Sequence, residues 1–341
     1  MRILILILII GNCLNVSSQT LGGNASFNFI QQSNAALLSA LGGYNISTIN
    51  NDVSVTFNNP ALLRKEMHQQ FSFSFNNFLA GIKNYSVSSA FYNHKYQTII
   101  SGGIHYFNYG VFTQTNAAGN ILGQMQASDY ALQISMCKQH KENWYIGATL
   151  KYLNSNYAAF QSNAIAVDVA LNFLDTTKFF QAAFVVKNMG TQLKKYSSQS
   201  NKQELPFDVQ LGITKRLPKA PFQFSLTAYH LQSGNILYND TLYNLSEGND
   251  AFKHKNYTAE KILSHLVIAA EIILNKQIQI NTGYNFLRRF DLNVYNTANG
   301  LNGITMGLTL KLKKLHFNYA TGFYQQNMFN QFSLKVGSLT K

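Results

Sequence analysis

The chain has 341 residues, of which only 12% are charged, and its 27 lysines and arginines outnumber its 14 aspartates and glutamates for a formal net charge of +13. Soluble domains typically contain about 25% charged residues, so this composition is unusual for one. The cations are dispersed and not clustered on a helix, which argues against nucleic acid as a partner. Anionic lipid head groups or an acidic partner suit the positive charge better.

The first residues have the pattern of a secretory signal peptide. Arg2 is followed by an unbroken apolar run over residues 3–10, and Ser18 offers a small residue before a cleavage point. This order of a cation, an apolar stretch and a small residue is typical of signal peptides. We therefore predict a signal peptide over residues 1–18, with Gln19 as the first mature residue.

The two cysteines add little chemistry. Cys13 could be a lipid-attachment cysteine, but Asn12 before it is larger than the small residue that such a site needs, so this alternative is less favoured. Cleavage would leave Cys137 as the single cysteine of the mature chain. A lone cysteine excludes an internal disulfide.

Residues 19–70 precede the strand-like part of the sequence and form a segment too long for a simple tether. Residues 35–41 are mostly Ala and Leu and predict a short helix that ends at Gly42 and Gly43. The Asn59-Pro60 pair predicts a turn toward the strands that follow. We expect this segment to fold as an N-terminal plug inside the barrel that residues 71–341 indicate.

From Phe71 onward, apolar and polar residues alternate in segments of about ten residues, the length that a tilted membrane strand requires. No stretch after residue 20 supplies the ~20 consecutive apolar residues of a membrane helix. We predict fourteen strands over residues 71–79, 84–93, 97–107, 128–139, 143–153, 163–173, 179–189, 205–214, 221–231, 264–274, 277–286, 301–312, 315–324 and 328–337.

The gaps between these segments differ by parity. Odd-numbered segments are followed by gaps of 4, 20, 9, 15, 32, 14 and 3 residues, and even-numbered ones by gaps of 3, 3, 5, 6, 2 and 2. Outer-membrane barrels have short periplasmic turns and longer outside loops in alternation, whereas the topology of a soluble β-sandwich does not sort loops by parity. The sequence thus predicts an all-β protein of the outer membrane, a 14-stranded antiparallel transmembrane β-barrel with an N-terminal plug-like segment.

The alternation also predicts which way side chains face. Val167 should face lipid, and Ala166 should face a lumen where a charge can meet water or a carboxylate such as Asp168. Charged residues on the lumen side either line a polar conduit or pair with each other and with the plug, and we favour pairing. These residues are Lys151, Asp168, Lys187, Asp208, Glu271 and Lys311.

No catalytic pattern is present. The eight histidines are scattered without metal-ligand spacing, and no nucleophile elbow, phosphate loop or dinucleotide fingerprint lies in a suitable context. A Ser and His pair on facing strands would leave no such pattern, so a membrane-embedded hydrolase is kept as an alternative. We expect no catalytic, cofactor-binding or metal-binding residues and a protein that is not an enzyme.

Several segments resemble one family of barrels. With the fourteen-strand pattern, they are similar to the PorV/PorQ family of the type IX secretion system, which is related to the long-chain fatty-acid transporter barrels. The resemblance covers nearly the whole mature chain, although the C-terminal "FSLKVGSLTK" lacks the terminal Phe of many barrels. The segments are "ALGG" at 40–43, "NNPALL" at 58–63, "YFNYG" at 106–110, "GNILGQMQASDYAL" at 119–132, "VVKNMGTQLKKY" at 185–196, "LPFDVQLGITKRL" at 205–217 and "APFQFSLTAYHLQ" at 220–232.

The resemblance implies a component of the complex that processes and attaches secreted cargo at the cell surface. Its partners would be outer-membrane lipid and cell-surface secretion-system proteins: a PorZ-like protein, with PorU and PorV in the same complex. The long gap at 233–263, with a possible short helix over 258–265, is the expected partner site, and 190–204 is the next candidate. The alternative is a transporter of hydrophobic molecules such as fatty acids. The lumen-facing positions are mostly Ser, Thr, Gly, Asn and Gln, which favours anchoring.

Overall fold

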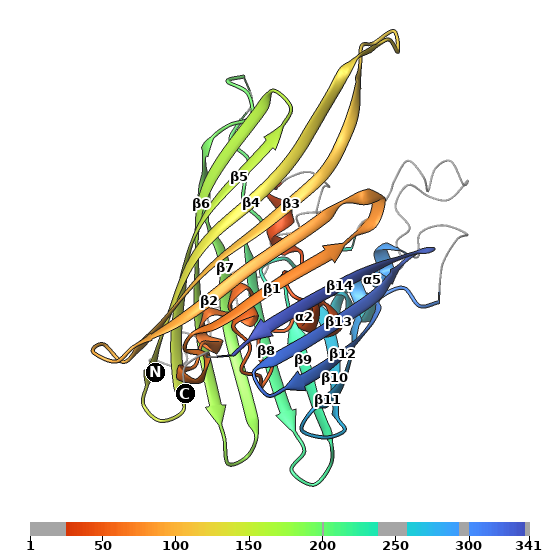
Figure 1. The fold of residues 1–341 in the computed structure, drawn as a ribbon. Helices are drawn as coiled ribbons and strands as arrows, with labels where there is room; N and C mark the ends of the chain where they lie inside the picture. Colours follow the sequence, from red (N-terminus) through yellow and green to blue (C-terminus); the bar gives the residue numbers. More distant parts are fainter. Residues whose placement is uncertain (1–24, 200, 238–257, 293–299, 338–341) are drawn as a thin grey trace.

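A computed structural model describes residues 25–199, 201–237, 258–292 and 300–337. The predicted signal peptide and most of the 233–263 gap lie outside these residues. The chain forms a closed barrel in which every strand pairs with its sequence neighbours and β1 pairs with β14 (Figure 1). The strands are β1 (Gln70–Asn77), β2 (Lys83–Asn93), β3 (Thr98–Thr115), β4 (Ile121–His140), β5 (Trp144–Tyr157), β6 (Phe160–Asp175), β7 (Phe180–Lys194), β8 (Asp208–Arg216), β9 (Phe222–Ala228), β10 (Leu266–Ile273), β11 (Ile278–Asn285), β12 (Ile304–Leu312), β13 (Leu315–Tyr324) and β14 (Asn327–Val336).

The closure explains why the strand count is even. Phe73 of β1 lies opposite Val87 of β2 on one side and Leu334 of β14 on the other, and both pairings are antiparallel. A closed sheet leaves no edge strand with unpaired backbone groups, and an even number brings both ends of the sheet to one side of the membrane. The predicted fourteen-stranded antiparallel barrel is confirmed.

The outer ends of several strands differ from the prediction. β3 has 18 residues and β4 has 20, so most of the predicted gap at 108–127 is a two-stranded hairpin that projects beyond the wall (Figure 1). Side chains on both faces of its outer part are exposed, so the apolar and polar alternation that marks a membrane strand is lost there. The connections at 116–120 and 158–159 are therefore short, and the parity of gap lengths is weaker than expected.

The long connections that remain all follow odd-numbered strands, at residues 195–207, 229–265 and 286–303. The connection after β9 contains helix α4 (Thr258–Ser264), which confirms the predicted short helix. Helix α5 (Phe286–Asp291) follows β11. We assign this face to the cell exterior and the face with short turns to the periplasm, because bacterial barrels have that asymmetry.

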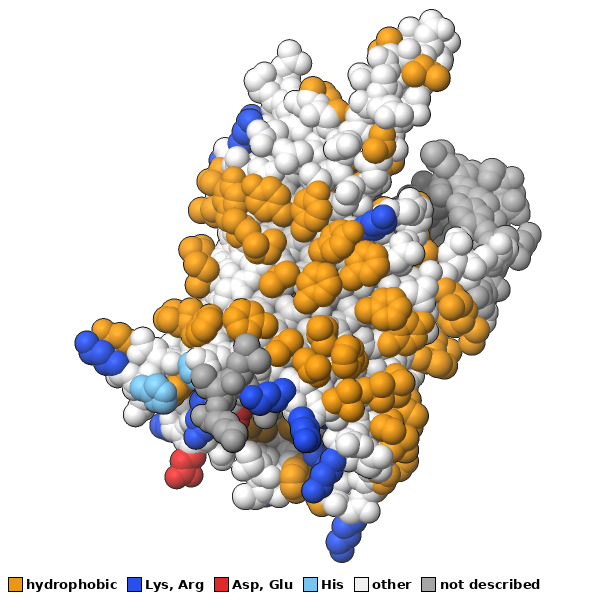
Figure 2. All heavy atoms as spheres, viewed as in Figure 1, with side chains coloured by type: hydrophobic (Ala, Val, Ile, Leu, Met, Phe, Trp, Pro, Cys, Tyr) orange, Lys and Arg blue, Asp and Glu red, His pale blue; other side chains and the backbone are white. Residues whose placement is uncertain are grey.

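Side chains face as the alternation predicted. Outward positions form a belt of exposed apolar side chains, among them Ile134, Leu150 and Val167. Figure 2 shows one face of this belt. The inward neighbours of these side chains, such as Gln133 and Lys151, are buried. No helix in the described part of the chain is long and apolar enough to cross a membrane.

Residues 25–69, called the hatch below, occupy the barrel interior. They form five short helices: η1 (Asn28–Gln31), α2 (Ala36–Ala40), η2 (Val53–Phe57), η3 (Pro60–Leu62) and η4 (Lys65–Met67), while η5 (Leu79–Gly81) lies between β1 and β2. The predicted helix is confirmed as α2, and Gly42 and Gly43 follow it with φ of 86° and 90°, a left-handed conformation that ends helices. Asn59 caps η3 by accepting a hydrogen bond from Ala61 N at 2.8 Å.

The hatch gives the barrel a hydrophobic core. Its largest cluster joins hatch residues such as Leu38 and Val55 to wall residues such as Ile99 and Ala269. A second cluster packs Phe27 and Phe29 against Ala166, which is only 1% exposed. The expectation that a charge at Ala166 would meet water is therefore wrong, because the hatch, and not water, fills the lumen at that position.

We expect Val167→Arg to reduce the yield of folded barrel. Val167 is 37% exposed on the outer wall, where a cation near the bilayer midplane costs roughly 2–4 kcal/mol. Val111→Arg is the matched control: Val111 is also exposed, but it lies on the projecting part of β3, beyond the last residue paired with β2. The measurement is the fraction of protein with heat-modifiable gel mobility after refolding into vesicles. Equal fractions for the two variants would contradict the assigned membrane belt.

Candidate functional site

The contact between the hatch and the inner wall is the main structural feature that bears on function. Wall side chains bind hatch backbone directly: Ser333 Oγ accepts from Ala36 N at 2.8 Å, and Ser86 Oγ donates to Asn34 O at 2.6 Å. Thr305 Oγ1 donates to Ala40 O at 2.9 Å. The first half of the hatch is thereby held to β2, β12 and β14.

The second half of the hatch has its own attachments. Ser47 Oγ lies 2.9 Å from Thr214 Oγ1 of β8. Near the periplasmic end, the Arg64 guanidinium donates to Ala61 O and Leu63 O and stacks over the Tyr145 ring at 3.6 Å. Burial lowers the pKa of Arg64 from its usual range, and the cation–π contact offsets part of that cost.

Glycines on the inner wall allow the hatch backbone to approach closely. A Cβ at Gly147 of β5 would lie 2.5 Å from Ala61 N, and one at Gly283 of β11 would lie 2.3 Å from Gly42 N. No side chain fits at such separations without moving the backbone. The wall is therefore complementary in shape to the hatch backbone at these two positions.

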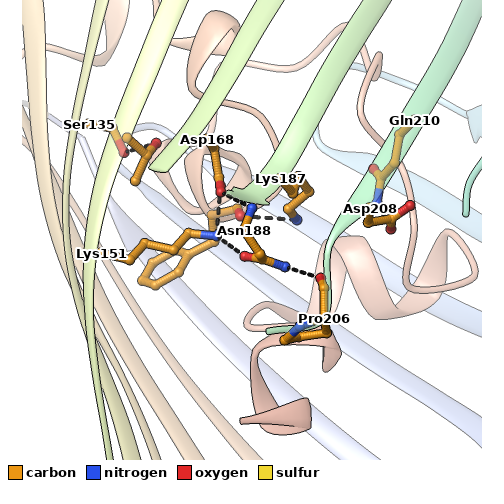
Figure 3. Close-up of polar contacts among 10 residues, drawn as sticks. Ser135, Lys151, Asp168, Lys187, Asn188, Pro206, Asp208 and Gln210 are labelled. Carbon is orange, nitrogen blue, oxygen red and sulfur yellow. Dashed lines mark hydrogen bonds and ion pairs between the residues drawn. The ribbon is translucent and has the colours of Figure 1, made fainter. Parts of the chain in front are cut away.

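A buried charged cluster joins β5, β6 and β7, and its Lys187 contacts the hatch (Figure 3). Lys151 Nζ lies 2.6 Å from Asp168 Oδ2 and donates to Asn188 Oδ1 at 2.9 Å. Lys187 Nζ, on the neighbouring strand, reaches Phe57 O of the hatch at 3.4 Å. Each charge thus has a polar partner, as buried charges require.

Asn188 was not singled out from the sequence, yet it organises this cluster. The pairing of β6 with β7 shifts register between Val167 and Val169, and Asn188 has φ of 60° at this bulge. The bulge turns Asn188 so that its N–H donates to Asp168 Oδ1 at 2.8 Å and its side chain donates to Pro206 O at 2.7 Å. A bulge that re-aims a side chain leaves no clear sequence signal.

The six predicted lumen charges all point inward, and four of them pair as predicted: Lys151 with Asp168, and Lys187 and Glu271 with the hatch. Glu271 accepts from Thr48 of the hatch at 3.1 Å and from Gln223 and Gln279 of the wall. Asp208 accepts from His230 N at 2.6 Å. Lys311 donates to Gln279 Oε1 at 3.0 Å.

Cavities lie toward the ends of the barrel. One of about 440 Å³ is at the outer end, between the start of the hatch and the aromatic rings of Tyr109, Tyr157 and Tyr196. The Tyr109 and Tyr157 hydroxyls both donate to Asp129 Oδ2, at 2.6 and 2.8 Å. A second cavity of about 230 Å³, also on the outer face, is lined by Tyr44, Tyr229, Arg288 and neighbouring residues. Among the residues that the structure describes, no three His, Cys, Asp or Glu side chains are grouped as a metal ion would require.

No protein-family model and no curated protein matches the sequence. Solved structures with a similar fold include two hydrocarbon channels and a FadL homologue. The CymD monoaromatic hydrocarbon channel has a TM-score of 0.52 at 12% identity, covering 89% of this chain and 96% of that one. A deltaS2 mutant of the TodX monoaromatic hydrocarbon channel has a TM-score of 0.53 at 11% identity, covering 90% and 97%. A Pseudomonas aeruginosa FadL homologue has a TM-score of 0.49 at 8% identity, covering 89% and 98%.

The closed sheet, the apolar belt and the likeness to CymD and TodX define the protein as an outer-membrane β-barrel with the fold of these hydrocarbon channels. Both of these neighbours are monoaromatic hydrocarbon channels. Identities of 11–12% establish the fold alone.

We expect Gly147→Val to lower the stability of the protein by roughly 1–3 kcal/mol, because the new side chain would collide with the hatch backbone at Ala61. Gly102→Val is the matched control, since a Cβ at Gly102 meets no atom within 4 Å. The measurement is the urea midpoint followed by fluorescence of Trp144, the single tryptophan. If both variants unfold at the wild-type midpoint, the hatch does not pack against β5.

Proposed function

We propose that this protein is a PorQ-like member of the PorV/PorQ family, and that it holds a cell-surface partner of the type IX secretion system attachment complex in the outer membrane. The partner would be PorZ-like, in a complex that also contains PorU and PorV. The seven sequence segments between residues 40 and 232 support the family assignment by their order and spacing. In this role the protein is an anchor and not an enzyme.

The packed lumen is the observation that carries the anchoring proposal. Hatch residues from Ala35 to Leu41 are almost fully buried, as are Val53 and Leu63, and the wall binds their backbone through Ser86, Thr305 and Ser333. An anchor needs a barrel whose lumen stays closed while a partner protein is bound at the exterior face. A conduit instead needs a route that solute can follow through the interior.

The exterior face supports the same function. The three long connections, residues 195–207, 229–265 and 286–303, begin and end at strand ends on this face, and α4 contacts α5 there. Exposed loops carried on a rigid barrel commonly hold the binding residues of a protein. The partner would therefore be held by these connections while the belt fixes the barrel in lipid.

A second candidate function is transport of hydrophobic molecules. The likeness to CymD and TodX favours it over anchoring, because both of those proteins are monoaromatic hydrocarbon channels. The outer cavity lined by Phe27, Tyr157 and Tyr196 could receive an aromatic molecule. Transport would then require the hatch to move away from the wall.

Replacement of residues 235–257 by a short Gly-Ser linker tests anchoring. Loop closure entropy changes slowly with length, so the barrel should remain folded and membrane-bound at normal abundance. We expect the surface partner to appear in the medium, as measured by immunoblot of the medium and membrane fractions. Retention of the partner with an intact barrel would exclude this connection as the partner site, and replacement of residues 195–204 would then be the next test.

A reversible cross-link separates the two functions. In the variant Ser47→Cys/Thr214→Cys, the side chains would meet where the two hydroxyls now lie 2.9 Å apart, so oxidation would lock the hatch to β8. Under anchoring, partner retention should be unchanged, and uptake of a monoaromatic hydrocarbon should not depend on oxidation. Loss of uptake on oxidation, with recovery on reduction, would contradict anchoring as the main function; the two single-cysteine variants are the controls.

A further inference from the structure

The positive charge of the chain is concentrated on the face with short turns. Every one of the six short turns contains at least one lysine, and Glu142 is the single carboxylate within them. On the opposite face, the connections at 78–82, 116–120, 158–159 and 325–326 have no charged residue, and the three long connections contain both signs. The lysines of the short turns, called the lysine ring below, are Lys95, Lys141, Lys178, Lys219, Lys276, Lys313 and Lys314.

The lysine ring lies just beyond the edge of the apolar belt. Each turn has an exposed apolar or aromatic side chain within three residues of its lysine: Tyr96, Trp144, Phe179, Phe222, Leu274 and Leu312, in chain order. The Lys95 ammonium lies 5.4 Å from the centroid of the Tyr96 ring. Aromatic side chains of membrane proteins sit at the head-group level, and long lysine side chains extend from that level toward water.

The ring faces little competing negative charge. The carboxylates toward this face of the described chain are Glu66, Glu142, Asp175 and the buried Asp52, and Asp175 lies 3.8 Å from Lys178 Nζ. All seven lysines are exposed, and further cations at the strand ends, among them Lys138 and Arg216, reinforce them. Lys and Arg side chains gather along the lower rim of the surface in Figure 2.

We propose that the lysine ring binds the phosphates of anionic phospholipids in the inner leaflet of the outer membrane. The distribution of the ring decides between lipid and protein as the ligand, because every turn around the perimeter contributes, whereas a docked protein would meet one side or the central mouth. Lysine is a flexible point charge that suits mobile phosphates. This interaction does not depend on the proposed anchoring function.

The test compares two variants in nanodiscs that contain equal amounts of phosphatidylglycerol and phosphatidylcholine. The lipids that stay bound to the barrel are counted by native mass spectrometry. The ring variant replaces Lys95, Lys141, Lys178, Lys219 and Lys276 by Gln. The control replaces the same number of lysines on the exterior half, namely Lys83, Lys194, Lys195, Lys202 and Lys261, by Gln.

We expect the wild type and the control to retain phosphatidylglycerol over phosphatidylcholine by at least about threefold, and the ring variant to lose this preference. About 1 M salt, where screening acts over roughly 3 Å, should abolish the preference of the wild type as well. Heat-modifiable mobility checks that each variant is folded. The proposal fails if the wild type shows no preference or if the ring variant keeps it; loss of a co-purifying acidic periplasmic protein with unchanged lipid preference would assign the ring to a protein partner instead.

Discussion

The structure depends on one constraint: every backbone N–H and C=O at membrane depth must find a hydrogen-bond partner within the protein. The chain meets that constraint by pairing β1 with β14, so that the sheet has no edge. Closure then divides the side chains into two sets. One set, such as Leu150, meets lipid, and the other, such as Lys151, is enclosed.

The enclosed side chains are polar because they surround the hatch, whose backbone needs hydrogen-bond partners. The hatch is built from helices of three to five residues, so much of its backbone lacks internal hydrogen bonds. Buried backbone groups need partners, and wall hydroxyls such as those of Ser86, Thr305 and Ser333 provide them. A lumen rich in Ser, Thr, Asn and Gln is therefore the complement of an irregular chain segment, and it does not by itself indicate a water-filled pore.

The interior and the fold comparisons point to different functions. Hydrogen bonds from the wall, among them the one from Lys187 to Phe57 O, and the close approach at Gly147 all hold the hatch in place, which suits a closed anchor. The fold is shared with two monoaromatic hydrocarbon channels. Because low sequence identity transfers the fold and not the function, the mobility of the hatch distinguishes the two roles.

The sequence by itself determined the barrel, its fourteen strands and the direction in which Val167 and Asp168 face, because lipid and lumen impose a strict period of two on every strand between them. It also determined α2, whose helix-forming run ends at two glycines. Beyond the membrane that period is absent, so the sequence pattern does not distinguish the outer parts of β3 and β4 from a loop.

Only the tertiary structure decided what fills the lumen. The burial of Ala166 against Phe27, the bulge at Asn188 and the contact of Gly147 with Ala61 each join residues far apart in the chain. A polar inward side chain has the same sequence signature whether it meets water or a backbone carbonyl. The difference lies in the path of the hatch, which packing against the whole wall determines.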